Sequence, residues 1–86
     1  MKYVKKPLII EAIRYDGTTI SEDEVKNFTG GIAIRIAGTR ILEIPTLEGI
    51  MKVLPNDWVI KGIQGEFYPC KDDIFTRTYD EIKEPF

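Results

Sequence analysis

Short apolar segments rich in β-branched residues recur along this chain, and residues 32–37 alternate with the period of a β-strand. A repeat of two predicts a strand, because successive side chains of a strand point to opposite faces. Glycine, proline and asparagine separate the segments and mark turns. On this basis we expect strands over residues 8–15, 32–37, 40–44, 50–54, 58–61 and 66–68.

The first of these strands differs from the others because its first half is apolar on both faces. Leu8, Ile9 and Ile10 follow one another directly, whereas residues 32–37 alternate. Two apolar faces are typical of a strand that is covered on both sides. We therefore expect residues 8–15 to lie in the centre of the sheet.

One segment carries the signals of a helix. Ser21 and Glu24 have the spacing of a capping box, in which each side chain bonds the other residue's backbone N–H. Gly30-Gly31 follows, and glycine favours the left-handed conformation that ends many helices. The pattern predicts a short helix over residues 22–29 with Ser21 as its N-cap.

The C-terminal part is predicted to be less regular. Pro69 has no backbone N–H, so the strand before it ends there or lies at a sheet edge. Asp72 or Asp73 is expected to cap a single helical turn. Residues 77–79 are expected to form a last short strand.

Tight turns connect most of the predicted strands. Gly38-Thr39 fits a two-residue type II′ hairpin turn, and Pro55-Asn56-Asp57 fits a turn with Asn56 in the left-handed region. Strands joined by such turns are antiparallel. We expect an α+β fold with a small, bent, mostly antiparallel sheet of five to six strands and one short capped helix. A partly closed barrel is the alternative.

Length and charge narrow the range of functions. The chain has 86 residues, which corresponds to a single domain over residues 1–86. Its net charge is -2 and its basic residues are scattered, which argues against general nucleic-acid binding, since that requires clustered cations. No apolar run approaches the length that spans a bilayer, so no membrane association is expected.

The residue types present exclude several kinds of catalysis. The chain has no histidine and a single cysteine, Cys70. Ser-His-Asp and Cys-His catalysis and a Cys/His zinc site therefore cannot form within one chain. We expect no catalytic residue, no metal and no cofactor. One cysteine also excludes an intrachain disulfide, as is usual in a reducing cytoplasm.

The second half of the chain carries a distinctive run, Gly65–Lys71 (GEFYPCK), followed by Asp73-Ile74-Phe75 and Thr78-Tyr79. Together with Ile44–Gly49 and Asp57–Gly62, these residues resemble a family of small uncharacterised proteins of bacteriophages and prophages. The opening residues, Lys5-Lys6-Pro7 and Ile10-Glu11-Ala12, match this family as well.

The resemblance is loose over residues 17–42, and two positions depart from the family's pattern. Asn56 stands where the family usually has glycine, and Asp72 where it often has proline. The resemblance implies a phage or prophage origin and a location in the cytoplasm of a bacterial host. It implies no biochemical activity.

Two arginines are candidates for binding an anion. Arg35 and Arg40 flank the Gly38-Thr39 turn symmetrically, which places them close together across the hairpin. Paired guanidinium groups bind phosphate or carboxylate groups well. The alternative is that Glu43 neutralises one of them.

A second set of candidates lies on the later strands. Trp58, Tyr68 and Phe75 are either an aromatic platform for a nucleotide ring or part of the core. A further candidate is a set of polar side chains that faces a ligand, and its members are Lys61, Glu66 and Lys71. In the alternative, Lys61 and Glu66 form an exposed cross-strand pair.

These observations favour a non-enzymatic phage or prophage accessory protein. Such a protein acts by binding a host protein or by sequestering a small ligand such as a nucleotide signal, in the role of a counter-defence or host-modulating factor. The small size favours a homo-oligomer, because a site can form between protomers. The alternatives are a small enzyme that uses Cys70 or Glu66, and a minor structural component of the virion.

Overall fold

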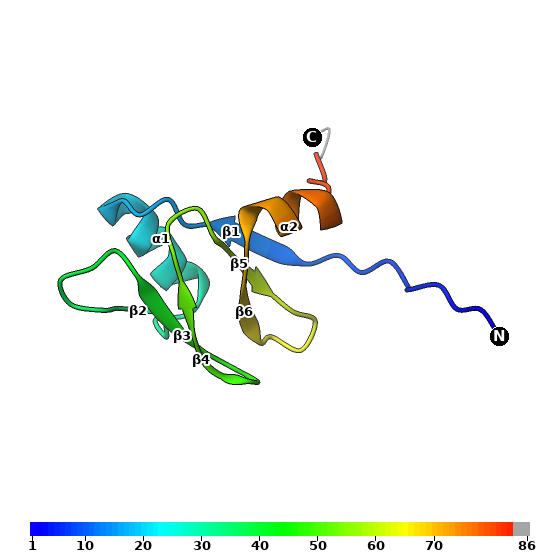
Figure 1. Cartoon of the computed structure of the whole chain (residues 1–86), viewed down its shortest axis with the longest axis horizontal. Helices are drawn as coiled ribbons and strands as arrows, with labels where there is room; N and C mark the ends of the chain where they lie inside the picture. The colour runs from blue at the N-terminus through cyan, green and yellow to red at the C-terminus, as the bar shows by residue number, and fades with distance from the viewer. Residues whose placement is uncertain (84–86) are drawn as a thin grey trace.

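The computed structural model describes residues 1–83, which form six strands and two helices. The strands are arranged in two antiparallel sheets of three strands, in the orders β1-β5-β6 and β2-β3-β4 (Figure 1). The elements in chain order are β1 (Glu11–Arg14), α1 (Thr19–Phe28), β2 (Ile34–Arg35), β3 (Leu42–Thr46), β4 (Gly49–Val53), β5 (Trp58–Lys61), β6 (Phe67–Cys70) and α2 (Asp72–Thr78).

The α+β class and the antiparallel pairing are confirmed, but the expectation of one sheet of five to six strands is wrong. The β3–β4 hairpin continues into β5 along the chain, yet β5 pairs with β1 instead of β4. The turn at Pro55–Asp57 carries the chain from one sheet to the other. The sheets do not close into a barrel, since each keeps two edge strands.

The core lies between the two sheets and α1. Its buried residues come from α1, β3, β4, β5 and the segments on either side of α1, and they are Tyr15, Val25, Ala33, Leu42, Ile44, Val53 and Val59. Phe28 of α1 and Phe67 of β6 pack against this cluster, with their rings edge to face at 5.7 Å. Helix α1 thereby closes one side of the space between the sheets.

Helix α1 begins earlier than predicted. Its N-cap is Thr18, whose hydroxyl accepts a hydrogen bond from the backbone N–H of Ser21 at 3.1 Å. Ser21 is buried, and its own hydroxyl accepts from the backbone N–H of Asp16 at 3.0 Å. The capping-box assignment to Ser21 is therefore wrong. The predicted end is confirmed, because Gly30 and Gly31 both have positive φ.

The first strand is shorter than predicted and lies at an edge. Strand β1 covers only Glu11–Arg14 and pairs with β5 alone. Residues 1–10, here called the N-terminal arm, run away from the body of the molecule on the side opposite α1 (Figure 1). The central position expected for residues 8–15 is thus not found within a single chain.

The connection between β2 and β3 is longer than the predicted two-residue turn. Ile36 N–H donates to the carbonyl of Ile41 at 2.8 Å, so residues 37–40 form the loop. Thr39 N–H donates to the carbonyl of Ile36, and Gly38 takes a φ of 77° at the third position of this turn. Strand β2 itself is reduced to Ile34–Arg35.

The later local predictions are mostly confirmed. Asn56 adopts a φ of 79°, as its turn requires, and Asp57 N–H donates to the carbonyl of Leu54. Strand β6 runs through Pro69 at the edge of its sheet. The strand predicted over residues 77–79 is wrong, because helix α2 continues to Thr78 and covers the outer face of β5.

Candidate functional site

A hollow of about 550 Å³ lies between the start of α1 and the loop after β2. Arg35 and Arg40 both line it, although they are not symmetric about the turn, since Arg35 pairs with Leu42. Thr19 and Glu22 of α1 form the opposite wall. The two arginines therefore come together, but a carboxylate from the helix lies with them.

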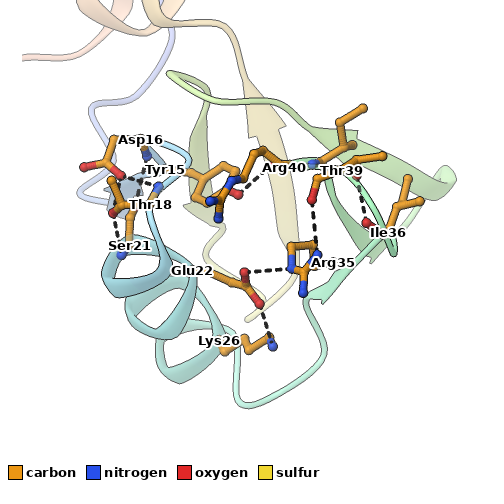
Figure 2. A network of polar contacts seen from close by, with 11 residues as sticks. Tyr15, Asp16, Thr18, Ser21, Glu22, Lys26, Arg35, Ile36, Thr39 and Arg40 are labelled. Carbon is orange, nitrogen blue, oxygen red and sulfur yellow. Dashed lines mark hydrogen bonds and ion pairs between the residues drawn. The ribbon is translucent and has the colours of Figure 1, made fainter.

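Glu22 occupies the position that an external anion would take at Arg35. Its Oε1 lies 3.1 Å from Arg35 Nε, and its Oε2 lies 2.8 Å from Lys26 Nζ (Figure 2). Arg35 Nη1 also donates to the carbonyl of Thr39 at 3.3 Å. Glu43, the carboxylate considered from the sequence, forms no ion pair within the described residues. Among residues 1–83, Arg40 also has no ion-pair partner.

Tyr15 fixes the loop that carries Arg40. Its side chain is fully buried, and its hydroxyl donates to the backbone carbonyl of Arg40 at 2.7 Å (Figure 2). Burial raises the pKa of Tyr15, and the nearby charge of Glu22 raises it further. Tyr15 was not among the predicted site residues, although a tyrosine at the end of an apolar strand signals a buried ring whose hydroxyl needs a partner.

The Glu22 carboxylate is expected to make the stability of the folded protein depend on pH in the acidic range. The hydrogen bond and charge of Lys26, with the charge of Arg35, lower the pKa of Glu22 below its usual value of 4.5 despite its burial. A lowered pKa contributes stability that is complete above the unfolded-state value and is lost as the pH falls through the folded-state value. We predict that Glu22→Gln lowers the melting temperature at neutral pH and that the difference from wild type shrinks below pH 4.5.

Thermal melts from neutral to strongly acidic pH measure this difference. Glu24→Gln, at an exposed position of the same helix, is the matched control and is expected to leave the melting temperature nearly unchanged. A difference between Glu22→Gln and wild type that stays constant into strong acid would show that the carboxylate is not stabilised by its cations.

A second recess lies between the tip of the β3–β4 hairpin and strand β6. It measures about 350 Å³, and the hairpin contributes Thr46, Leu47, Glu48 and Met51. The facing wall consists of residues 66–69, which include the predicted candidates Glu66 and Tyr68. We call this recess, with its lining residues, the hairpin groove. Its hairpin wall was not predicted as part of a site.

Within the hairpin groove, Glu66 also holds the turn between β5 and β6. Its Oε1 accepts from the backbone N–H of Gln64 at 3.1 Å, and its carboxylate lies against Gly62, where a Cβ would collide with it. Lys61 lies opposite Phe67 and Glu11 in the two strand pairings. Lys61 and Glu66 form no ion pair in the part of the chain that the structure describes.

The aromatic candidates hold α2 on the outer face of the first sheet. Trp58 and Phe75 stack with ring centroids 3.9 Å apart, and Trp58 Nε1 donates to Asp72 Oδ1 at 2.9 Å. Burial, together with the neighbouring Tyr79, raises the pKa of Tyr68 to about 12. One face of Trp58 is thus already occupied by Phe75, but neither ring belongs to the core cluster.

Lys71 pairs with a buried carboxylate. Its Nζ lies 3.1 Å from both carboxylate oxygens of Asp57, and Asp57 Oδ2 also accepts from the backbone N–H of Leu54 at 2.9 Å. Burial raises the pKa of the Cys70 thiol, and the charges of Asp57 and Asp73 raise it further. Lys71, the cation next to Cys70 in the chain, is therefore engaged with Asp57.

The described residues show neither a metal centre nor a membrane span. Residues 1–83 contain no cluster of three acidic or cysteine side chains placed to hold a metal ion. Neither helix of this part of the chain is long and apolar enough to cross a bilayer.

Comparison with known proteins adds no relative from which a function can be transferred. The chain matches no family model, no curated protein and no solved structure.

Proposed function

We propose that this protein is a non-enzymatic binding protein and that its target is another protein. The observation that carries the proposal is the exposed apolar surface at the hairpin groove. Leu47 is 77% exposed at the hairpin tip, and Met51 and Ile50 are also exposed. An exposed apolar cluster beside a recess is characteristic of a protein-interaction site.

The charges of the hairpin groove favour a particular kind of partner segment. Both charged side chains that line it, Glu48 and Glu66, are acidic, and its remaining walls are largely apolar. Interfaces combine an apolar centre with a polar rim of complementary charge. A segment with apolar side chains and a nearby lysine or arginine fits these walls.

The resemblance to phage and prophage proteins supports a target in the bacterial host. The residues that carry the most specific part of the resemblance, Gly65–Lys71, include the whole β6 wall of the hairpin groove. A host factor or defence component of the bacterial cytoplasm is the target we propose. Binding alone then blocks the target, and no chemical step is needed.

Affinity capture from an infected or lysogenic bacterial cell tests this proposal. The bait is tagged wild-type protein, compared with Leu47→Asp and with the control Ile20→Asp, whose side chain is 74% exposed on α1. We expect mass spectrometry to find a host protein that wild type and Ile20→Asp retain and Leu47→Asp loses. Identical proteins on all three baits would contradict a binding role for the hairpin groove.

The enzyme alternative makes a different prediction for Cys70. The thiolate is the reactive form of cysteine, and the raised pKa reduces its share at neutral pH. We therefore predict that a thiol-reactive probe labels Cys70 in the folded protein more slowly than it labels free cysteine. Labelling in denaturant is the control and is expected to reach the rate of free cysteine. Faster labelling in the folded state would favour the enzyme instead.

A small anionic ligand is the second candidate, supported by the position of Arg40. Its side chain is exposed and lines the hollow beside Arg35. Arg35 is already paired with Glu22, so a phosphate there has to compete with that carboxylate. Calorimetry with cyclic nucleotides tests this candidate. Heat of binding that disappears in Arg40→Ala would support it, and absence of heat from wild type would remove it.

A further inference from the structure

Strand β1 has a free edge, although the sequence just before it is typical of a strand that is covered on both sides. Its only partner among the described strands is β5. The residues just before it, Leu8, Ile9 and Ile10, are apolar on both faces, yet Ile9 is 79% exposed in the N-terminal arm. Natural proteins use charged side chains, β-bulges or a covering element to keep an edge strand from pairing with another chain. An apolar, extended segment at a bare edge indicates that a further strand pairs here.

The hydrogen bonds at Tyr15 show which backbone groups face this edge. Tyr15 N–H donates to the carbonyl of Asp57 at 2.9 Å, and its carbonyl accepts from the N–H of Asn56. Odd-numbered residues of this segment therefore direct their backbone groups toward β5. Backbone groups alternate along a strand, so Leu8, Ile10 and Ala12 direct theirs to the free edge.

Pro7 does not interrupt this edge. As an odd-numbered residue it lies where the backbone N–H would point toward the β5 side, so its missing N–H removes no donor from the free edge. The arm is thus able to continue the strand of β1 toward the N-terminus. What it lacks is a second strand alongside.

The arm itself has the charge and shape of that second strand. Lys2, Lys5 and Lys6 are its only charged side chains, and Glu11 is the first acidic residue after it. When the segment lies antiparallel to a copy of itself with Leu8 at the centre, Lys5 lies opposite Glu11 on both sides of that centre. The same register puts Val4 opposite Ala12 and Tyr3 opposite Ile13.

Both members of each of these pairs point to the same face, as antiparallel pairing requires, because their numbers have the same parity. Ala12 lines an apolar groove of about 540 Å³ between β1 and α2, together with Leu8, Ile10 and Phe75. Val4 of the second copy comes to lie over this groove. Charge, hydrogen bonding and apolar contact thus agree on one register.

We propose that the protein forms a symmetric homodimer in which residues 5–11 of two copies pair antiparallel and the N-terminal arm of each copy continues along the free edge of β1 of the other. The two-fold axis passes beside Leu8, as a self-complementary interface requires. The two β1-β5-β6 sheets then join into one continuous sheet. Strand β6, at the opposite edge, stays free, so the dimer presents two hairpin grooves. The inference does not depend on what those grooves bind.

Charge reversal with rescue tests this register by sedimentation. We expect wild type to be dimeric at micromolar concentration and Lys5→Glu and Glu11→Lys each to raise the dimer dissociation constant at least tenfold. The double variant, which exchanges the two charges, is expected to recover most of the wild-type affinity. Lys52→Glu, an exposed reversal on β4, is the control and is expected to leave the dimer intact.

A cross-link gives a second, independent readout. In the proposed register Leu8 faces Leu8 of the second copy, at a spacing of about 5.5 Å between Cα atoms that suits a disulfide. Leu8→Cys in a Cys70→Ser background is therefore expected to oxidise to a covalent dimer. A monomeric wild type, a double variant as weak as the single ones, or a Leu8→Cys protein that stays uncross-linked would overturn the proposal.

Discussion

Replacing Tyr15 with alanine is expected to lower the free energy of unfolding by about 3–5 kcal/mol, the usual cost of removing a buried aromatic side chain. Tyr15 is the largest fully buried side chain, and its ring lies in the cluster that joins both sheets and α1. The surrounding elements cannot collapse into the space without moving apart from one another. For a chain of this size, the loss is a large part of the total stability.

Tyr15→Phe separates the contribution of the hydroxyl from that of the ring. It keeps the packing but leaves the carbonyl of Arg40 without its donor, at a cost of about 1 kcal/mol. Urea unfolding of both variants measures these differences, with Ile63→Ala in the exposed turn between β5 and β6 as a neutral control. An alanine variant as stable as wild type would show that the sheets do not share one core.

Trp58→Ala is expected to release α2 and to lower the free energy of unfolding by about 2–3 kcal/mol, since the indole is only half-buried. The substitution removes both the stack on Phe75 and the hydrogen bond to Asp72. A helix as short as Asp72–Thr78 does not persist in water without tertiary contacts. Backbone amides of α2 should therefore exchange with solvent much faster, while those of β3 stay protected.

Trp58→Phe is the matched variant for this helix. It retains an aromatic ring for stacking and loses only the indole N–H bond, so a cost of about 1 kcal/mol and a protected α2 are expected. If α2 amides are as well protected in Trp58→Ala as in wild type, something other than the aromatic stack holds the helix.

Local signals in the sequence predicted the antiparallel pairing of β2 with β3 and of β5 with β6, the Asn56 turn and the end of α1, because these depend on neighbouring residues. The division into two sheets was not predictable in this way. It depends on the pairing of β1 with β5, which are far apart in the chain. Residues 77–79 looked like a strand from their side chains alone. Residues 77 and 78 are helical instead, because α2 packs on Trp58 and begins with acidic residues that stabilise the helix dipole.

The candidate site residues show the same difference between local and long-range contacts. The closeness of Arg35 and Arg40 followed from their places on either side of one turn, although Arg35 pairs across the strands with Leu42. The carboxylate of Glu22 was missed because it reaches Arg35 only once α1 folds over the sheets. Glu66 and Tyr68 were recognised on their own strand. Their neighbour Leu47 was missed, since only the packing of β6 against the β3–β4 hairpin brings it alongside.

The most direct test of a protein-binding hairpin groove is the dissociation constant of the captured host protein, measured by calorimetry with purified components. Leu47→Asp puts a charge at the apolar hairpin tip, whereas Ile20→Asp makes the same change at an equally exposed position on α1. The account predicts at least tenfold weaker binding for Leu47→Asp and wild-type affinity for Ile20→Asp. Equal affinity for all three proteins would contradict it.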